Sequence, residues 1–480
     1  MSPSLVKLFS LQNNKERRTH RMMFQQGHRI LAGISKDFGL EGLATPRMQD
    51  IAKNLLIRTG RQSKRYCPLK PRLVLWLVVA LALYRNDSIA NVFERLMSWV
   101  RDIEPRLCRR AITPEAICHA RKRLGASPLK LMFREVVQEG KPVEPTFHGL
   151  RVFGIDGSEF TVPDTKKNSV VFGRHQGGRG PGAYPQVKGI FIVDVATHRI
   201  RNCSFFPYFS SEVVLLPFLM KDLKKGDLLL LDRGLSSFLA MLKCRQRKAN
   251  FLFRLSASWK PQFIRKLGKG DTLMRFVACG KVRRRLPPGE RDTAFVLRVL
   301  EFKVGNGELV RLVTDLVDPW KFPAVELAQL YHQRWECELA YKELKSQLVA
   351  VTSSKQQTHF RSKSPVKVLQ EAWGMVLAHT LVRQLMLEGA EESKVPPLTL
   401  SFTDSLQTIK LALRGFQTVN RKIKHRRRRE LIKELGKCLI DRPRRKRQCP
   451  RVVRRKMSTF RLKRKGDRAS PLDTDIEFVI

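Results

Sequence analysis

Acidic residues are scarce in this sequence. Its 480 residues include 43 Asp and Glu against 92 Lys and Arg, which gives a net charge of +49 at pH 7. This excess is too large for an ordinary soluble enzyme and predicts a polyanionic partner, with nucleic acid as the first candidate. A membrane surface is the weaker alternative, because the sequence has no basic amphipathic helix with bulky apolar anchors and no lipidation motif.

Long apolar runs and paired cysteines are also missing. The longest apolar run, residues 73–84, is shorter than the roughly 20 residues of a transmembrane helix, so we expect a buried helix there and no membrane partner. The nine cysteines include no Cys-x-x-Cys pair and no Cys/His spacing typical of zinc sites. We therefore expect free thiols and a cytoplasmic, nucleoid-associated protein.

Helical patterns fill residues 61–145. The apolar run is followed by an amphipathic stretch at 88–100 and by a basic stretch at 113–125, for which Thr113 is a suitable N-cap and Gly125 a suitable end. This last stretch carries three adjacent basic residues, Arg121, Lys122 and Arg123. It is either a helix that enters a DNA groove or a solvated helix of a bundle, and the sequence leaves both possibilities open.

Strand patterns begin at residue 146. Residues 150–164 are typical of a strand, a tight turn and a second strand, and residues 187–197 of a third strand. The apolar run at 227–237 predicts a strand that is buried on both faces. Residues 250–315 alternate apolar and polar side chains, which indicates a β-rich insertion, and helical patterns return at about 324–350 and 364–388.

The stretch YHQRWECELAYKELK, residues 331–345, predicts one helix with sorted charges. On a helix that turns about 100° per residue, four side chains share an arc of roughly 60°. These are Tyr331, Arg334, Glu338 and Lys345. Glu336 falls on the opposite side, where we expect it to face outward. The shared face could hold a plain i,i+4 ion pair between Arg334 and Glu338, or a carboxylate that is placed for chemistry.

Two aspartates complete a candidate acidic site with Glu338. Asp156 and Asp232 each follow an apolar strand, and the carboxyl ends of such strands are where ligands of α/β sheets gather. Three carboxylates can hold two Mg²⁺ ions, which suits the cleavage of a phosphodiester, and we expect Mn²⁺ to substitute. Arg334 and Lys345 could hold DNA phosphates beside the metals.

These residues resemble the motifs of a known family. IDGS at 155–158, LDRG at 231–234 and the spacing Tyr331-x2-Arg334-x3-Glu338-x6-Lys345 look like those of DDE transposases, and the last is similar to the Tyr-Arg-Glu-Lys signature of the insertion-sequence-four (IS-four) type. The resemblance covers roughly residues 60–390 and includes two stretches, 73–96 and 120–133, that resemble the N-terminal domain of that family.

The resemblance implies a fold and roles for individual residues. It implies an α/β RNase H-like catalytic core with a β-strand insertion. The helical patterns and the charge runs of the sequence add an all-helical N-terminal domain and a basic, partly disordered C-terminal region, and this C-terminal region is longer and more cationic than the family leads us to expect. Asp156, Asp232 and Glu338 would be the metal-binding catalytic triad. The residues that would contact transposon-end phosphates are Tyr331, Arg334, Lys345 and, by a weaker resemblance, Arg254. Trp259 and Trp320 are candidates for stacking on a flipped base, although a core position is the more common role of a Trp.

We accordingly expect six segments. They are a basic N-terminal segment (1–60), a helical DNA-end-binding domain (61–145), the first part of the catalytic core (146–245), the β-rich insertion (246–318), the second part of the core (319–390) and a basic C-terminal region (391–480). Within the last, residues 421–468 hold 23 Lys or Arg and 4 Asp or Glu. Such dense charge favours disorder and non-specific phosphate binding, with a passive solubilising tail as the alternative.

The expected function is cut-and-paste DNA transposition. The protein would bind the terminal inverted repeats, pair them as a homodimer, cleave with Mg²⁺ and join the free 3′-OH to target DNA. One alternative is a non-catalytic or repurposed DNA-binding protein derived from a transposase. Another is a metal-dependent nuclease without strand transfer, which would use the same site.

Overall fold

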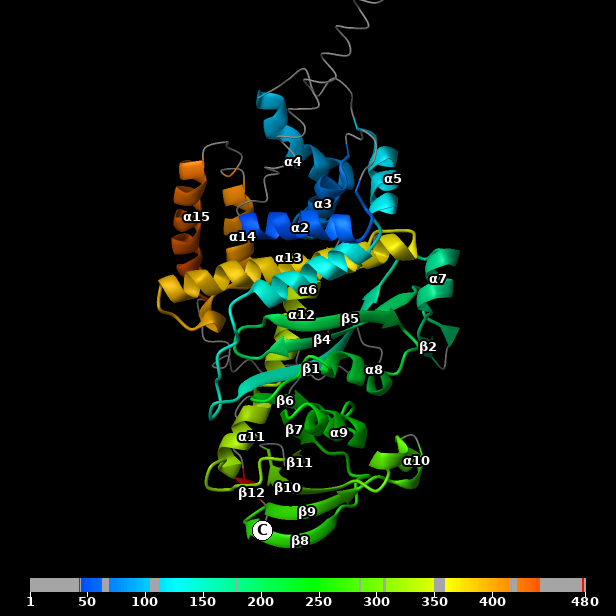
Figure 1. Ribbon diagram of the computed structural model, residues 1–480, viewed down its shortest axis with the longest axis vertical. Helices are drawn as coiled ribbons and strands as arrows, with labels where there is room; N and C mark the ends of the chain where they lie inside the picture. The colour runs from blue at the N-terminus through cyan, green and yellow to red at the C-terminus, as the bar shows by residue number, and fades with distance from the viewer. Residues whose placement is uncertain are drawn as a thin grey trace, which may run out of the picture.

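A central sheet with helices on both faces forms the body of the computed structural model (Figure 1). The long helix α13 (Pro365–Glu392) crosses the molecule between the N-terminal helices and the sheet. The structure describes residues 43, 45–62, 69–103, 112–177, 180–284, 286–304, 308–348, 359–413, 416, 421–440 and 477–478. The expected segment at 1–60 and most of the chain beyond 440 therefore lie largely outside the described residues.

The structure describes five helices in the N-terminal part. They are α2 (Pro46–Arg58), α3 (Pro71–Leu83), α4 (Ile89–Ile103), α5 (Pro114–Leu124) and α6 (Ser127–Glu139). Helix α3 is buried from Leu73 to Leu83 and packs on α13, as its uniformly apolar sequence predicts. Gly374 permits this close packing, because a Cβ there would lie 2.8 Å from the Val78 Cγ1 atom. Helix α5 has the predicted cap, in which the Thr113 hydroxyl accepts from the Ala116 amide at 3.2 Å.

The sheet has the order β5-β4-β1-β6-β7 in its first half. Its strands are β1 (Arg151–Thr161), β4 (Gln186–Asp194), β5 (Ile200–Pro207), β6 (Asp227–Leu231) and β7 (Asn250–Arg254). Strands β1, β6 and β7 are parallel to one another, whereas β4 pairs antiparallel with β1, and β5 pairs antiparallel with β4. This mixed arrangement fits an RNase H-like core. The tight turn expected within 150–164 is wrong, because β1 continues without a break through Gly157 and pairs with β4 along its length.

The β-rich stretch extends this same sheet. Its strands are β8 (Gln262–Gly268), β9 (Asp271–Val277), β10 (Ala294–Lys303) and β11 (Leu309–Thr314). Because β11 pairs with β7, the insertion continues the core sheet through an antiparallel edge. The short β12 (Glu477–Phe478) pairs with β10, and β2 (Gln176–Gly177) pairs with β3 (Gly180–Pro181) in a separate hairpin.

Shorter helices and two 3-10 turns complete the described fold. They are α7 (Lys166–Phe172), α8 (Glu212–Met220), α9 (Phe238–Gln246), α10 (Gly280–Arg283), the 3-10 turns η2 (Pro288–Glu290) and η3 (Pro397–Thr399), α11 (Ala324–His332) and α12 (Trp335–Gln347). Two apolar cores result, one between the sheet and the helices around α13, the other beneath α8 and α9. The single helix expected over 331–345 is wrong in one respect, because a turn at Gln333 and Arg334 separates α11 from α12.

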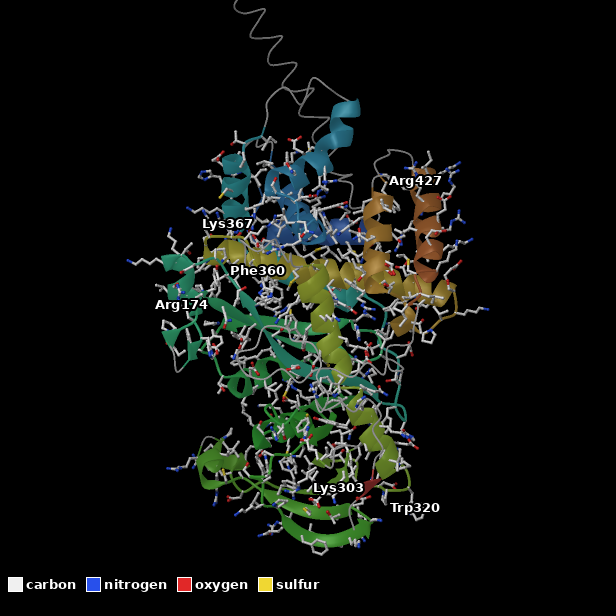
Figure 2. All side chains as sticks on the ribbon, turned by 180° about the vertical axis from the view of Figure 1, so that it is seen from behind. Arg174, Lys303, Trp320, Phe360, Lys367 and Arg427 are labelled. Carbon is white, nitrogen blue, oxygen red and sulfur yellow. The ribbon has the colours of Figure 1, made fainter. Side chains whose placement is uncertain are left out.

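Part of the basic C-terminal region is a folded helix. Helices α14 (Phe402–Leu413) and α15 (Arg421–Gly436) pack on α13, with Leu431 and Leu435 of α15 buried. The expected disorder is therefore wrong for the 16 residues of α15. Arg427 marks this helix beside α14 in Figure 2, which shows the molecule from behind. Among the described helices, none is long and apolar enough to cross a membrane.

Candidate active site

Register within the sheet brings Asp156 and Asp232 together. Ile155 of β1 pairs with Leu231 of the parallel strand β6, so the two aspartates are the next residues on neighbouring strands. Strand β6 ends at Leu231, as expected, but Asp156 lies in the middle of β1 and not at its end. The two aspartates therefore meet at the carboxyl end of β6, beside the middle of β1.

Helix α12 reaches this edge because a glycine leaves room for it. A Cβ at Gly154 would lie 2.3 Å from the Cys337 Sγ atom, so any larger residue would push the helix off β1. The Tyr341 hydroxyl donates to the Asp156 carbonyl at 3.0 Å, which ties α12 to the strand a second time. Glu338 lies between these two contacts along the helix and therefore beside Asp156.

Arg334 links two of the three acids. Its Nη2 donates to Glu338 Oε1 at 3.1 Å, and its Nη1 is 3.7 Å from Asp156 Oδ2. Burial raises the pKa of Asp156 to about 6. The Gly157 amide and Arg334 oppose this rise, while the charges of Asp232 and Glu338 add to it. Asp156 therefore lies within electrostatic range of both other acids.

Tyr331 lies against the loop that carries Asp232. Its hydroxyl donates to the Leu231 carbonyl at 3.2 Å. Burial raises the pKa of Tyr331 to about 12; Arg334 and Arg254 lower it, while Asp232 raises it. Arg254, the last residue of β7, forms an ion pair with Glu308. The structure thus brings Tyr331, Arg334 and Arg254 to the same side of the sheet as Asp232.

Lys345 lies near the outer end of β1. Its Nζ is 5.3 Å from the ring centroid of Phe160. Burial lowers the pKa of Lys345, whereas the charges of Glu159 and Asp156 raise it. The lysine is thus within electrostatic range of the acidic site and half-buried against an aromatic ring.

The donor chemistry suits a hard divalent cation, because Mg²⁺ prefers carboxylate oxygens. Among the described residues, however, no three His, Cys, Asp or Glu side chains are close enough together to hold a metal ion. The guanidinium of Arg334 balances the charge of both Asp156 and Glu338. A cation held by those two carboxylates would take over the role of Arg334.

Glu336 does not face outward as expected. It is 9% exposed, and its Oε2 is 3.0 Å from His198 Nε2. The helical spacing correctly places Glu336 and Glu338 on opposite sides of α12. The side that carries Glu336, however, packs against the turn between β4 and β5 and against α13. Glu343, seven residues further on, is buried on the same side. This seven-residue spacing was the available signal, whereas no sequence pattern indicated His198.

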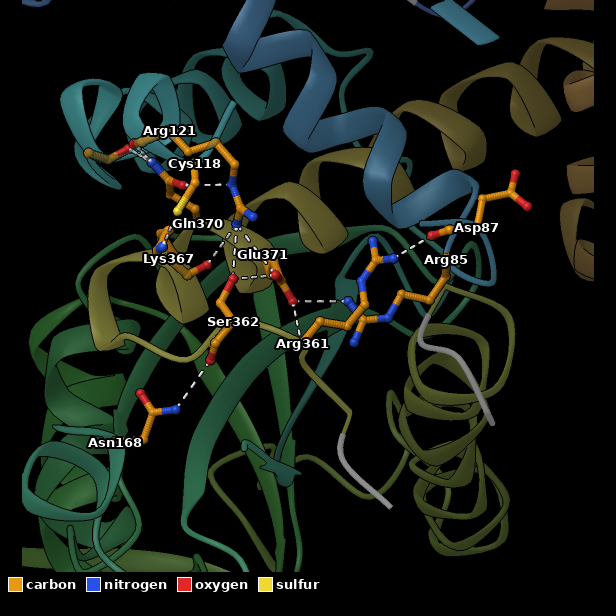
Figure 3. Close-up of polar contacts among 11 residues, drawn as sticks. Arg85, Asp87, Cys118, Arg121, Asn168, Arg361, Ser362, Lys367, Gln370 and Glu371 are labelled. Carbon is orange, nitrogen blue, oxygen red and sulfur yellow. Dashed lines mark hydrogen bonds and ion pairs between the residues drawn. The ribbon is translucent and has the colours of Figure 1, made fainter. Parts of the chain in front are cut away.

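Arg121 does not reach DNA as expected. Only 2% of it is exposed, and its guanidinium donates to Gln370, Ser362, Glu371 and the Lys367 carbonyl (Figure 3). That expectation is wrong because α5 packs this residue against α13. Its neighbours Lys122 and Arg123 are exposed and stay candidates for DNA contact.

The two tryptophan positions differ from each other. Trp259 is partly buried, with its ring centroid 5.7 Å from that of Phe276. Trp320 is 92% exposed and points away from the body in Figure 2, so a core position is wrong for it.

Comparisons with known proteins find two matching family models and two similar transposases. The model of the insertion element 4 transposase N-terminal domain matches residues 40–134, and that of the transposase DDE domain matches residues 147–381. The transposase InsG for insertion sequence element IS4 of Escherichia coli (strain K12) is 32% identical over 84% of this chain and 90% of its own. The putative transposase InsZ of the same organism is 28% identical over 39% of this chain and 61% of its own.

One solved structure gives a weaker match. It is a cryo-EM structure of the piggyBac transposase synaptic complex with hairpin DNA, with a TM-score of 0.45 and 11% identity over 85% of both chains.

Proposed function

The chain belongs to the DDE transposases of the insertion element 4 type and is a DNA transposase, and we propose that Asp156, Asp232 and Glu338 form its catalytic site. The observation that carries this proposal is the convergence of three acids from β1, β6 and α12 at one sheet edge. The register of β1 with β6, the electrostatic coupling of Asp156 to both other acids, and Arg334 between two of them support it.

We propose Mg²⁺ as the cofactor, held by the three carboxylates as two ions. When bound, such ions activate the attacking oxygen and stabilise the charge on the leaving oxygen. The residues of the chain supply carboxylates that are held in place. Asp156 is fixed by the Gly157 amide at 2.7 Å, and Asp232 by the Leu235 amide at 2.9 Å, so each carboxylate presents a constrained orientation. DDE transposases as a class use divalent metal ions.

The cationic groups around the site suit the DNA backbone. We propose that Tyr331, Arg334 and Lys345 hold phosphates of the cleaved end and that Arg254 holds a further one. A phosphate that binds Arg334 would draw this guanidinium from Asp156 and Glu338 and leave both carboxylates available. The binding of DNA and the availability of the Asp156 and Glu338 carboxylates for a metal ion would then be linked through the Arg334 side chain.

We further propose that residues 61–145 recognise the inverted repeats, with Lys122 and Arg123 of α5 at the DNA. Helix α15 adds a basic surface beside α14, and phosphate contacts there would be independent of sequence. The two ends would be paired by a homodimer, and the protein would associate with the nucleoid through its positive charge.

A test uses the full-length protein with labelled DNA that carries the element end, with and without Mg²⁺. We expect metal-dependent cleavage that Asp232→Ala abolishes, followed by joining of the 3′-OH to a second DNA. Tight end binding without cleavage in both proteins would favour the repurposed binder. Cleavage without any joining would favour a nuclease.

A further inference from the structure

A buried polar cluster lies on the side of α12 that faces away from Asp156. We propose that this cluster, with His198 and Glu343 at its centre, positions Glu338 by fixing the rotation of α12 on the sheet. The other members are Glu336 of α12 and Arg383 and His379 of α13. The inference rests on the proposed assignment of Glu338 to the catalytic site.

One imidazole connects two parts of α12. His198 Nε2 is 3.0 Å from Glu336 Oε2, and its Nδ1 is 2.8 Å from Glu343 Oε1. Residues seven apart lie nearly above one another on a helix, two turns apart. The ring therefore fixes α12 at two points along a single line and opposes both rolling and sliding of the helix.

Helix α13 fixes the same carboxylate from the other side. Arg383 Nε donates to Glu343 Oε2 at 3.0 Å, and His379 Nε2 is 3.1 Å from that oxygen. Burial alone would raise the pKa of Glu343, but Arg383 and His198 hold it well below its ordinary value. The carboxylate thus stays ionised in the interior and binds both elements strongly.

The backbone at His198 is shaped for this contact. Its φ of 59° lies in the left-handed region, which is costly for a residue other than Gly. The turn is supported by Asp194, which accepts from the Ala196 amide at 3.1 Å and from the Thr197 hydroxyl. A strained conformation held by its surroundings places the fully buried ring beneath α12.

The opposite side of α12 is fixed to β1. Cys337 lies over Gly154, and the Tyr341 hydroxyl bonds to the Asp156 carbonyl. With both sides held, the direction of Glu338 is set by the helix as a whole. Because a displacement of about 1 Å at a reacting group can cost about 100-fold in rate, the cluster controls activity without touching DNA.

Stability alone is a weak reason for such a cluster. Buried ion pairs often contribute little net stability compared with apolar side chains of the same volume, because removing charges from water is costly. The defined geometry of a hydrogen-bonded network is better suited to fixing one arrangement of α12.

His198→Gly tests the role of the ring. Glycine adopts positive φ freely, so this change removes the side chain without adding backbone strain. We expect single-turnover end cleavage to fall about 10- to 100-fold, as for residues that orient active-site ligands. The Kd for end DNA should not change, and free imidazole should restore part of the rate by refilling the cavity. A variant that cleaves at the wild-type rate would overturn the proposal. So would a loss of rate that imidazole does not restore and that accompanies a lower melting temperature of the variant.

Glu336 provides a second test at the edge of the cluster. Glu336→Gln keeps a polar side chain that can still bond to His198 Nε2 and should retain most of the cleavage rate, whereas Glu336→Leu removes this partner and should lose about tenfold or more. Equal rates for the two variants would overturn the positioning role. If the wild type itself fails to cleave, the proposed function fails; if wild type and all variants cleave equally, only this inference fails.

Discussion

Arg334 lies between the carboxylates of two proposed catalytic residues, 3.1 Å from Glu338 Oε1 and 3.7 Å from Asp156 Oδ2. A guanidinium in this place balances negative charge that a divalent cation would otherwise balance. The same side chain is a candidate ligand for the DNA backbone. Its position therefore connects the state of the acids to the presence of DNA.

The Arg334→Gln variant should bind Mn²⁺ more tightly than the wild type when no DNA is present. Removal of a cation within about 4–6 Å of a carboxylate changes its affinity for positive charge by about tenfold or more. A titration followed by electron paramagnetic resonance of free Mn²⁺ measures this directly. Equal or weaker affinity in the variant would show that Arg334 does not compete with metal.

Glu338→Gln should abolish end cleavage and leave end binding largely intact, because it removes a proposed metal ligand without changing the shape of the side chain. Glu336→Gln is the matched control, two residues away on the opposite side of the same helix, and should keep most of the activity. Cleavage rates and gel-shift affinities of both variants separate chemistry from binding. Similar loss in both would contradict the assignment of roles to the two faces.

Glu371 should make the folded protein less stable as the pH falls below about 4.3. Burial would raise its pKa, but Arg85, Arg121 and hydrogen bonds hold it at about 2. The folded pKa is below the ordinary value of about 4.3, so this contribution is complete above that value and is lost as pH falls toward about 2. The melting temperature of the wild type should fall through this window.

Glu371→Gln provides the comparison for that prediction. The variant should be less stable at pH 7, by about 3–5 kcal/mol, because it leaves two buried arginines without their counter-ion. Its melting temperature should change less between pH 5 and 2. Parallel curves for the two proteins would show that other groups govern the acid transition.

The outward face of α15 should bind DNA without regard to sequence. Leu431 and Leu435 of this helix are buried, so deletion would disturb the fold, and substitutions are the better test. The triple change to Gln at Arg426, Arg429 and Lys433, all exposed, should weaken binding to every DNA. If each side chain neutralises one phosphate, the slope of log K against log salt should fall by about 0.9 per contact. Exchanging Arg and Lys at the same positions keeps the charge and should preserve the slope.

The sequence predicts those features that depend on local pattern. The buried helix α3, the Thr113 cap of α5 and the buried strand β6 each follow from a short run of residues. Strand ends, a helix face and motifs together predict a shared site of Asp156, Asp232 and Glu338, and the register between β1 and β6 places the two aspartates at neighbouring positions. The uninterrupted β1 was missed because Asp156-Gly157 resembles a turn, and pairing with β4 overrides that local preference.

Partners distant in the sequence account for the other errors. Arg121 looks like a solvated basic residue until α13 brings Glu371 to it, 250 residues away. Glu336 looks exposed until the turn at His198 packs beneath it. In both cases a charged side chain is buried because a hydrogen-bonding partner comes from another element, and spacing within one segment carries no information about that partner.

The most direct test of the central claim asks whether Asp232 binds the catalytic metal. Thiolates bind Mg²⁺ poorly and accept softer ions, so metal preference reports on ligation itself. We predict that Asp232→Cys, folded and still able to bind the element end, loses cleavage with Mg²⁺ and regains part of it with Mn²⁺. Unchanged cleavage with Mg²⁺ would contradict a catalytic metal site at Asp232, Asp156 and Glu338.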